Sequence, residues 1–287
     1  MNPILKWAGG KSKVFQYFSN IYNYSTHKRY IDLFCGSLSL PLQLAPKNAV
    51  FNDINSSLIN VYKIIQKSPE SLIEQLEDVN KDSYNTKEKF EELRKEYNDT
   101  ILSSETEIRH AVLFIYLNKR SFNGLYRENS SGKYNVPYRK YNTSIYNKNN
   151  IMALSVYFRE NCIQFFSQDF REFSLDFFNK DDLVYIDPPY YSSEKSKFVS
   201  YWRRPFLIKD QHALREFCKK LDNKGVQIIL SNSPCKEIKD MYSDFFQYCF
   251  YIGRQMRNAK GKSKVFENKK EANEILLWNY SIIDFEN

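Results

Sequence analysis

The octapeptide Leu183-Val184-Tyr185-Ile186-Asp187-Pro188-Pro189-Tyr190 decides how the rest of this chain is interpreted. Its first half is an uninterrupted apolar run, which is typical of a buried strand. Prolines cannot continue a central strand, so the strand has to end at Asp187. In open α/β sheets, ligands bind at the carboxyl ends of the strands. The octapeptide therefore predicts an α/β fold with a functional site where Asp187, Pro188 and Tyr190 leave the sheet.

The groups at the end of this strand suit attack by an amine whose lone pair is delocalised into a ring or a carbonyl, such as the exocyclic amine of adenine. The Asp187 carboxylate and the Pro188 carbonyl can accept the two amine hydrogens and so free the lone pair. Tyr190 can stack on the flat base, and positioning of this kind can lower a barrier by about 7–11 kcal/mol. An Asp-Pro turn after a strand is also common for structural reasons alone. The tetrapeptide by itself leaves both interpretations open.

Two segments near the N-terminus contain glycines in a glycine-poor chain: Lys6-Trp7-Ala8-Gly9-Gly10-Lys11 and Tyr30-Ile31-Asp32-Leu33-Phe34-Cys35-Gly36-Ser37. The second segment predicts a first strand and a turn in which Gly36 lets the backbone approach a ligand closely. The first segment ends like a phosphate loop. A Walker loop needs a further glycine five positions before Gly10, where this chain has Leu5. A nucleoside-triphosphate site is therefore not expected.

A second strand is expected at 49–53, and it ends in Asp53. Asp53 follows Asp32 by about twenty residues, the spacing at which an acid binds the ribose hydroxyls of a nucleoside cofactor in a Rossmann-like unit. An acid in this place can equally stabilise the N-terminus of the next helix. Both roles remain open for Asp53.

These segments, in this order and along nearly the whole chain, resemble the Dam family of DNA adenine methyltransferases, in which a target-recognition insert precedes the Asp-Pro-Pro-Tyr motif. The resemblance implies a Rossmann-like α/β sheet with helices on both faces, S-adenosyl-L-methionine as the cofactor, and catalysis by Asp187, Pro188 and Tyr190. The cofactor contacts that it implies are Trp7, Ala8, Gly9, Lys11, Asp32, Phe34, Gly36, Ser37, Asp53, Asp169, Phe170 and Asp187. Among these, Asp53 is expected to hold the ribose, and Asp169 with Phe170 the adenine ring.

The stretches 117–127 and 134–141 resemble a hairpin that enters the duplex in GATC-methylating relatives. The residues that match its DNA contacts are Lys6, Phe122, Asn123, Leu125, Arg127, Pro137, Lys140 and Tyr141. An arginine such as Arg127 can read guanine with two hydrogen bonds, which discriminates by about 1–3 kcal/mol. The residues alone would equally suit an ordinary exposed hairpin. The resemblance thus implies double-stranded DNA as the partner and a site that is GATC or similar.

Two positions depart from the family pattern. Leu38 stands where a second glycine usually follows Gly36, so close packing of the cofactor against this turn is in question. Phe122 stands at the wedge position, where relatives often have tyrosine. Stacking should survive this change, but a contact to the orphaned partner base could differ.

The composition agrees with a nucleic-acid partner. The chain has 42 Lys and Arg against 34 Asp and Glu, a formal charge of +8 and a pI near 9.0, which favours a polyanionic partner. Basic clusters are found at Arg203 and Arg204, next to Tyr201 and Trp202, and at Arg254, Arg257, Lys260, Lys262 and Lys264. A solvated charged loop is the alternative for each cluster.

Other features exclude classes of protein. Five cysteines without paired spacing and three histidines predict no zinc site, and no metal is expected. The odd number of cysteines fits reduced thiols in a cytosol. The chain has neither a signal peptide nor an apolar run of about eighteen residues, so a soluble, cytoplasmic protein without membrane contact is expected.

The periodicity of apolar residues indicates the organisation of the chain. Strands are expected at 30–34, 49–53, 163–167, 183–186, 226–231, 246–252 and 275–280, and helices at 55–66, 86–97, 105–118 and 210–221. The change to charged helices and a polar hairpin predicts an inserted, mostly helical target-recognition domain at 61–149. The catalytic domain would then comprise 1–60 and 150–287.

The resulting hypothesis is a site-specific methyltransferase that acts on a flipped adenine in double-stranded DNA. A cognate restriction endonuclease that acts separately on the same site is kept as a further partner. Three alternatives remain: an RNA adenine methyltransferase, a protein-amide methyltransferase, and a catalytically silent DNA-binding module.

Overall fold

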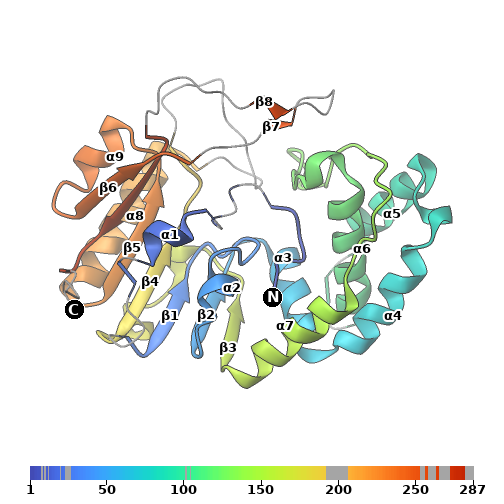
Figure 1. Ribbon diagram of the computed structural model, residues 1–287, viewed down its shortest axis with the longest axis horizontal. Coiled ribbons are helices and arrows are strands. Elements are labelled where there is room, and N and C mark those ends of the chain that lie inside the picture. Colours follow the sequence, from blue (N-terminus) through green and yellow to red (C-terminus); the bar gives the residue numbers. More distant parts are fainter. Residues whose placement is uncertain are drawn as a thin grey trace. The chain divides into compact units, whose positions relative to one another are not determined.

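The computed structural model describes residues 1–7, 9, 11, 13–19, 21–22, 27–100, 102–103, 105–191, 206–252 and 272–281, together with the backbone at 256–257 and 263–264. The fold is α/β, with a seven-stranded, mostly parallel sheet in the strand order β3-β2-β1-β4-β5-β9-β6. Figure 1 labels the helices and strands. The chain divides into two compact units. The first holds the described residues of 1–12 and 29–173, and the second holds those of 13–28, 174–191 and 206 onward. The α/β class expected from the sequence is confirmed.

The first unit contributes three parallel strands. They are β1 (Arg29–Asp32), β2 (Ala49–Asn52) and β3 (Ile163–Phe166), with β2 between the other two. All four residues of β2 are buried, as expected for a strand of a parallel sheet that is covered on both faces. The predicted strands are confirmed, and each ends one or two residues earlier than expected. Because parallel strands end at the same edge, the turns that follow β1, β2 and β3 come together there.

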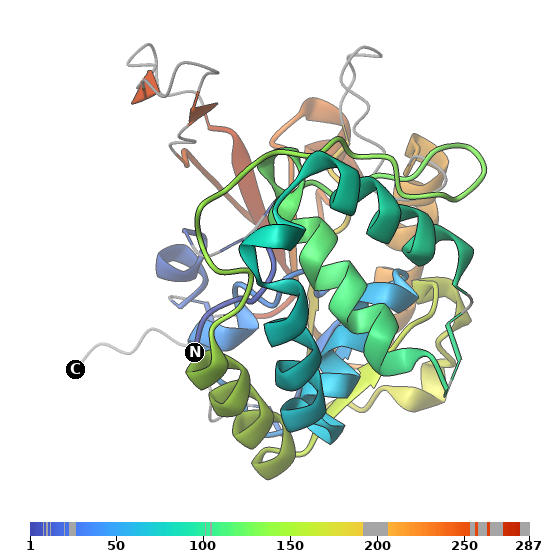
Figure 2. The ribbon, with the colours of Figure 1, turned by 90° about the vertical axis from the view of Figure 1, so that its right-hand side faces the viewer.

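Helix α6 lies at the centre of a group of helices in the first unit, and its residues from His110 to Asn118 are all buried. Helix α6 packs against α3, α4 and α5, which Figure 2 shows around it. The bounds are α2 (Pro41–Leu44), α3 (Ser56–Lys67), α4 (Pro69–Val79), α5 (Lys87–Asp99), α6 (Glu107–Arg120) and α7 (Lys148–Glu160). Helices α3, α5 and α6 were predicted from the sequence and are confirmed.

Helices α4 and α7 were not predicted. Pro69 suggests a break after α3, yet it occupies the first turn of α4, where a missing N–H costs nothing. Helix α7 follows the polar hairpin stretch, and Asn147 caps it by accepting a hydrogen bond from the Asn150 N–H at 3.0 Å. Helices α3 to α7 belong to the same compact unit as β1 to β3. The domain boundaries at 61 and 149 stay a prediction.

The second unit contains the strand that leads into the Asp-Pro-Pro-Tyr motif. This strand, β4 (Asp182–Ile186), is buried throughout and runs parallel to β5 (Gln227–Asn232). Strand β9 (Glu274–Trp278) is antiparallel to both β5 and β6 (Phe246–Phe250). The predicted strands at 183–186, 226–231, 246–252 and 275–280 are thereby confirmed, with bounds that differ by up to two residues.

The helices of the second unit are α1 (Phe15–Phe18), α8 (Ile208–Asn223) and α9 (Lys236–Met241). Helix α8 confirms the helix predicted at 210–221, and it buries Leu214, Phe217, Cys218 and Leu221. A separate two-stranded sheet pairs β7 (Met256–Arg257) with β8 (Ser263–Lys264). The unit is thus a mixed sheet with α8 packed on β5.

Three further findings concern membrane-spanning helices, metal ions and disulfides. None of the helices in the described ranges combines the length and the apolar character needed to cross a membrane. In that same part of the chain, no three side chains of His, Cys, Asp or Glu meet as a group that could hold a metal ion. The five cysteines are free thiols.

Candidate functional site

The turn after β1 brings Gly36 against the indole of Trp7. Gly36 has φ +48°, in the left-handed region, and a Cβ there would lie 3.0 Å from Trp7 Cδ1 and 3.2 Å from Trp7 Nε1. The indole also stacks on Tyr126, with ring centroids 5.7 Å apart, and on Phe114, at 6.3 Å. The structure therefore unites Trp7 and Gly36, which the sequence assigned to one site.

Asp53 supports the same turn from the end of β2. Its Oδ2 accepts a hydrogen bond from the Gly36 N–H at 3.1 Å, and its Oδ1 accepts one from the Asn55 N–H at 2.9 Å. Tyr62 donates its hydroxyl to the Gly36 carbonyl at 2.7 Å, so both polar groups of Gly36 are held. Burial raises the pKa of the partly exposed Asp53 to about 6, against the lowering effect of the two hydrogen bonds. Asp53 is therefore a structural acceptor as well as a candidate ligand of a ribose.

A buried asparagine links the turns that follow all three strands. Asn52, the last residue of β2, is 1% exposed. Its Nδ2 donates to the Leu33 carbonyl and to the Gln168 carbonyl, each at 3.0 Å, and its Oδ1 accepts from the Gln168 N–H at 3.1 Å. Asn52 was not among the residues predicted from the sequence to belong to the site. The sequence feature that could have revealed Asn52 is a polar residue at the end of an otherwise apolar strand.

Asp169 and Phe170, which were predicted to hold the adenine ring of the cofactor, lie next to the predicted cofactor contact Phe34. Phe170 is 3% exposed, and its ring centroid lies 5.9 Å from that of Phe34. The neighbouring Asp169 carboxylate forms an ion pair with Arg171 at 2.8 Å, and the Arg171 guanidinium lies over the Phe170 ring. The structure thus brings Phe34, Asp169 and Phe170 to one place, next to the end of β3.

The remaining predicted cofactor contacts are mostly buried polar groups. Asp32 is 2% exposed and accepts a hydrogen bond from the Phe34 N–H at 3.1 Å. Ser37 shares a hydrogen bond with Ser39 at 2.7 Å. Lys11 is 8% exposed and donates to the Gly9 carbonyl at 3.0 Å. Ala8 lies outside the described residues.

Leu38 adopts the backbone conformation that the glycine expected at this position would favour. Its φ is +60°, and its side chain is 0% exposed. A left-handed conformation costs a non-glycine residue about 1–2 kcal/mol. The turn therefore keeps its shape without the second glycine, because the buried leucine side chain offsets the strain.

The Asp-Pro-Pro-Tyr motif leaves β4 directly, as predicted. Pro188 is buried, while Asp187 and Tyr190 are partly buried. The Tyr190 hydroxyl donates to the carboxylate of Glu274, the first residue of β9, which is 3% exposed. Burial, followed by the charges of Asp187 and Glu274, raises the pKa of Tyr190 well above its usual range. The phenol is therefore neutral, and its ring rather than its oxygen is available for contact.

Polar side chains hold the backbone on either side of Tyr190. Gln211 on α8 donates its Nε2 to the Pro189 carbonyl at 3.0 Å, and the Tyr191 N–H donates to Asn232 Oδ1 at 3.3 Å. Asn232 Nδ2 in turn donates to Gln211 Oε1 at 3.2 Å. Neither Gln211 nor Asn232 was predicted from the sequence to belong to the site. Both are polar residues in otherwise apolar positions, Gln211 on α8 and Asn232 at the end of β5. This pattern is the sequence feature that could have revealed them.

The candidate DNA hairpin has one buried and one exposed face. Antiparallel pairing occurs at two isolated bridges, Ser121 with Tyr138 and Glu128 with Tyr134. The buried residues include Ser121, Gly124, Tyr126, Tyr134 and Val136, and the exposed ones include Phe122, Asn123, Arg127, Pro137 and Lys140. Leu125 and Tyr141 are partly buried. Most residues assigned to DNA contacts therefore point to solvent, and Phe122 does so with 44% of its surface.

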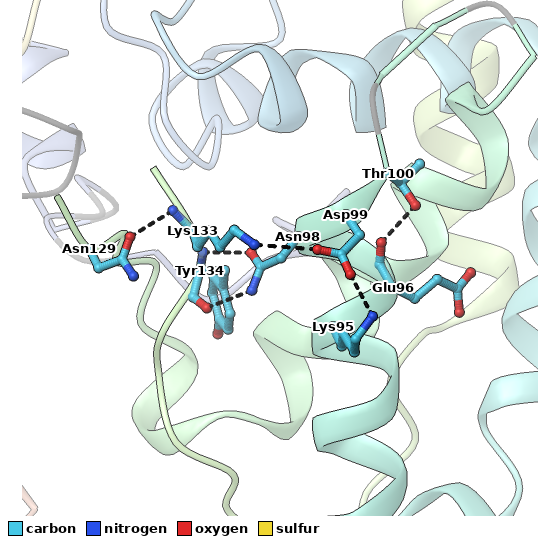
Figure 3. Close-up of polar contacts among 8 residues, drawn as sticks. All are labelled: Lys95, Glu96, Asn98, Asp99, Thr100, Asn129, Lys133 and Tyr134. Atoms are coloured by element: carbon cyan, nitrogen blue, oxygen red, sulfur yellow. Dashed lines mark hydrogen bonds and ion pairs between the residues drawn. The ribbon is translucent and has the colours of Figure 1, made fainter. Parts of the chain in front are cut away.

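The return arm of this hairpin, directly after the turn at 129–133, is tied to the end of α5 (Figure 3). Asn98 Oδ1 accepts from the Tyr134 N–H at 2.7 Å, and Asn98 Nδ2 donates to the Tyr134 carbonyl at 3.1 Å. Asp99 forms ion pairs with Lys95 at 2.7 Å and with Lys133 at 3.4 Å. Asn98 pairs with Tyr134 as a neighbouring strand would, so the return arm of the hairpin has a fixed position.

Lys6 reaches the hairpin because of Gly124. The Lys6 backbone is held by Asn118, which accepts from the Lys6 N–H at 2.9 Å and donates to the Lys6 carbonyl at 2.8 Å. A Cβ on Gly124 would lie 2.6 Å from Lys6 Cδ, so a side chain at 124 would displace Lys6. The Lys6 ammonium lies 3.9 Å from the centre of the Tyr141 ring. Lys6 and Tyr141, both assigned to DNA contacts, are thus neighbours.

Several cations crowd around this point. The Arg139 guanidinium lies 5.3 Å from the centre of the Phe122 ring and 5.6 Å from that of Tyr141. Burial, with the charges of Arg139 and Arg120, lowers the pKa of Lys6. Burial, with the charge of Lys6, lowers the pKa of Lys119 to about 8. Mutual repulsion of this kind is relieved by a bound polyanion.

The other basic clusters are not part of the described side chains. Tyr201, Trp202, Arg203, Arg204, Arg254, Lys260 and Lys262 lie outside the described residues. Arg257 and Lys264 lie on β7 and β8, of which only the backbone is described.

Comparison with known proteins places these features in a family. Residues 7–258 match a family model described as D12 class N6 adenine-specific DNA methyltransferase. The Type II methyltransferase M1.LlaDCHI of Lactococcus lactis subsp. cremoris is 38% identical over 282 residues, covering 98% of this chain and 96% of that protein. The Type II methyltransferase M.MjaIII of Methanocaldococcus jannaschii is 31% identical over 295 residues, covering 98% and 99%. A DNA adenine methylase of Serratia marcescens is 29% identical over 266 residues, covering 92% and 95%.

The strain at Leu38 can be tested by comparing two truncations. Leu38→Ala and Leu38→Gly both lose a buried side chain, at a cost of about 2–5 kcal/mol. Only glycine relieves the left-handed strain of about 1–2 kcal/mol. Glycine also loses more conformational entropy on folding than alanine, which lowers the stability of the glycine variant by about 0.5–1 kcal/mol. In urea unfolding, the glycine variant should therefore be about 0.5–1 kcal/mol more stable than the alanine variant.

Leu40 provides the matched control for this comparison. It is 1% exposed but has φ −81°, in the right-handed region. At this position the alanine variant should be the more stable of the two, because no left-handed strain is relieved. Alanine winning at both positions would contradict the assignment of strain to Leu38.

Proposed function

Because the chain belongs to the D12 class N6 adenine-specific DNA methyltransferase family, we propose that it transfers the methyl group of S-adenosyl-L-methionine to the exocyclic amine of a flipped adenine in double-stranded DNA. The observation that carries this proposal is the group at the end of β4. There the Asp187 carboxylate, the Pro188 carbonyl and the ring of the partly buried Tyr190 follow one another along four residues. These are the two acceptors and the stacking surface that an aromatic amine requires.

The turn after β1 suits S-adenosyl-L-methionine, which when bound supplies a methyl group on a cationic sulfur. Asp53 is a partly exposed carboxylate at the carboxyl edge of the parallel strands, where the two hydroxyls of a ribose would find an acceptor. Phe34 and Phe170 offer neighbouring rings to a purine. The remaining assigned contacts to this cofactor are Trp7, Gly9, Lys11, Asp32, Gly36, Ser37, Asp169 and Asp187.

In the proposed reaction the chain positions the amine rather than removing its proton in advance. The Asp187 carboxylate and the Pro188 carbonyl each accept one amine hydrogen, which favours a tetrahedral nitrogen with a directed lone pair. Tyr190 stacks on the base and keeps the amine in line. The amine nitrogen becomes cationic on transfer and loses its proton afterwards. The base has to leave the duplex first, because an enzyme cannot reach this atom inside the stack.

The exposed face of the hairpin is the proposed reader of the duplex. Phe122 would take the place of the extruded base in the stack, and Arg127 would read guanine with two hydrogen bonds. Arg127 Nε donates to Asn135 Oδ1 at 2.7 Å in the structure, so it would exchange this partner for a base. Lys6, Lys140 and Tyr141 would contact the phosphates and bases nearby. We propose a recognition site that is GATC or similar.

The relatives that are named Type II methyltransferases suggest a role in restriction–modification. In this role the chain would methylate a site that a separate endonuclease cuts. We propose this role for the chain, with the endonuclease as a functional partner that recognises the same DNA sequence.

Transfer of a labelled methyl group tests the proposed function. The purified protein is incubated with labelled S-adenosyl-L-methionine and, in separate reactions, with duplex DNA, RNA and protein. Label is expected on adenine in duplex DNA alone, and sequencing of a plasmid methylated in cells should show one short motif. Label on RNA or protein instead of DNA would overturn the proposal, and so would tight DNA binding without any transfer.

Asp187→Ala should lower kcat by at least about 100-fold, because a preorganised acceptor contributes on the order of 10²–10³ to such rates. The fold and most of the DNA affinity should remain. Asp181→Ala is the matched control, because Asp181 is an exposed acid six positions earlier that pairs with Lys28 at 2.7 Å. Its kcat should not change. Retained methylation by Asp187→Ala would refute the role assigned to Asp187.

Binding of S-adenosyl-L-methionine should weaken as the pH falls through about 6, the raised pKa of Asp53. The ionised carboxylate accepts the ribose hydroxyls, and protonation removes this capacity. Between pH 7 and pH 5 the Kd should rise by about tenfold, because the ionised fraction of a carboxyl with this pKa falls by about that factor. Calorimetry across this range checks the effect. Asp53→Asn should bind more weakly and without this pH dependence, and an unchanged slope in this variant would exclude Asp53 as its source.

A further inference from the structure

The segment from Pro189 to Tyr191 is fixed by side chains from two other elements. Gln211 donates to the Pro189 carbonyl at 3.0 Å, and Asn232 accepts from the Tyr191 N–H at 3.3 Å. Ser233 adds a hydrogen bond from its hydroxyl to the Tyr191 carbonyl at 2.7 Å. The motif therefore does not behave as a free loop after β4.

The two amide side chains act together because they also bind each other. Gln211 and Asn232 are both 0% exposed, and Asn232 Nδ2 donates to Gln211 Oε1 at 3.2 Å. Inside a protein an unmade hydrogen bond is costly, so removing one member weakens the contacts of the other. The Pro188 carbonyl lies between the end of β4 and the bonded Pro189 carbonyl, and proline rings fix φ on both residues. By holding the next two residues, Gln211 and Asn232 limit how far the Pro188 carbonyl can turn.

A third side chain controls the ring of Tyr190. The Tyr190 hydroxyl donates to the carboxylate of Glu274, which is 3% exposed at the start of β9. The register of β9 is determined by its pairing with β6, where Glu274 lies opposite Phe250. A tyrosine ring that is free at its tip turns about two side-chain bonds. A bond at the tip stops rotation about the Cα–Cβ bond, because that rotation would move the hydroxyl away from Glu274. The centre of the ring is thereby held in place, although rotation about the Cβ–Cγ bond leaves the hydroxyl where it is.

We infer that Glu274 is a positioning residue for the stacking ring of Tyr190, and that Gln211 and Asn232 are positioning residues for the Pro188 carbonyl acceptor. The inference rests on the proposed function, since it assigns these three residues to the reaction at the Asp-Pro-Pro-Tyr motif. None of the three needs to touch the base. They raise the fraction of time in which ring and carbonyl are in place for methyl transfer.

A double-mutant cycle tests the part played by Glu274. Glu274→Leu and Tyr190→Phe each remove the hydrogen bond, and each should lower kcat about three- to tenfold at saturating DNA and cofactor, the effect of a looser near-attack geometry. The double variant should be no slower than the slower single variant, because both changes remove the same bond. Glu274→Gln keeps an acceptor and should recover most of kcat. The Kd for S-adenosyl-L-methionine should stay within about twofold in all variants.

Tyr280→Phe is the matched control for the loss of a tyrosine hydroxyl. The Tyr280 hydroxyl donates to the Ile21 carbonyl at 2.6 Å, in the same unit but away from the motif. This variant should lower the Tm and leave kcat unchanged. Independent, multiplicative effects of Tyr190→Phe and Glu274→Leu would overturn the inference, as would a kcat for Glu274→Leu equal to that of the natural chain.

Gln211→Met tests the second part, because methionine has a similar shape but no donor. Its kcat should fall with little change in KM, and adding Asn232→Leu should lower kcat no further. An unchanged kcat in Gln211→Met, or a loss confined to KM, would overturn the role of Gln211.

Thermal unfolding of the same variants separates this inference from the proposed function. The Tm changes of Tyr190→Phe and Glu274→Leu should be non-additive, whether or not DNA is methylated. Absence of methyl transfer by the natural chain would end the proposed function. Additive Tm changes in an active enzyme would end only the inference about Glu274.

Discussion

In each of the two units, a buried asparagine amide at the carboxyl end of a strand holds the turns that carry the candidate site residues. Asn52 at the end of β2 binds the turns that follow β1 and β3, and Asn232 at the end of β5 binds Tyr191 and Gln211. Both amides are almost fully buried, with 1% and 0% exposure. Where strands end, the sheet no longer pairs the backbone, and an amide supplies both donors and an acceptor to replace the ladder. The turns that carry the candidate site depend on these two side chains for their shape.

The chemistry that results is one of position and charge rather than of unusual acidity. At the motif, the raised pKa of Tyr190 keeps the phenol neutral, and its hydroxyl is directed to Glu274, so the ring face is left for a flat partner. At the hairpin, Lys6 and Lys119 have lowered pKa values because burial and neighbouring cations disfavour their charge. Crowded cations cost stability in the free protein, and a polyanion offsets that cost on binding. Both features suit a member of a DNA methyltransferase family.

Sequence patterns predicted the elements well where one physical signal dominated. Every strand of the main sheet was predicted within two residues, because buried strands appear as apolar runs bounded by polar turns. Helices with a clear apolar stripe, such as α3 and α8, were also predicted. Helix α4 was not predicted, and its Pro69 occupies the first turn, where proline is compatible with a helix. The buried polar residues Asn52, Gln211, Asn232 and Glu274 were missed as parts of the site, since their value lies in partners that are distant along the chain.

The sequence by itself determined the α/β class, the end of β4 just before Asp187 and the chemical identity of the candidate ligands, because these follow from local rules of proline, apolar runs and residue type. Tertiary structure alone decided that Trp7 lies on Gly36, that Asn98 pairs with Tyr134, and that Tyr190 is held by Glu274. These contacts join residues up to 84 positions apart, and a linear pattern does not record which distant groups share a hydrogen bond. Only folding, which buries polar groups and forces each to find a partner, makes that choice.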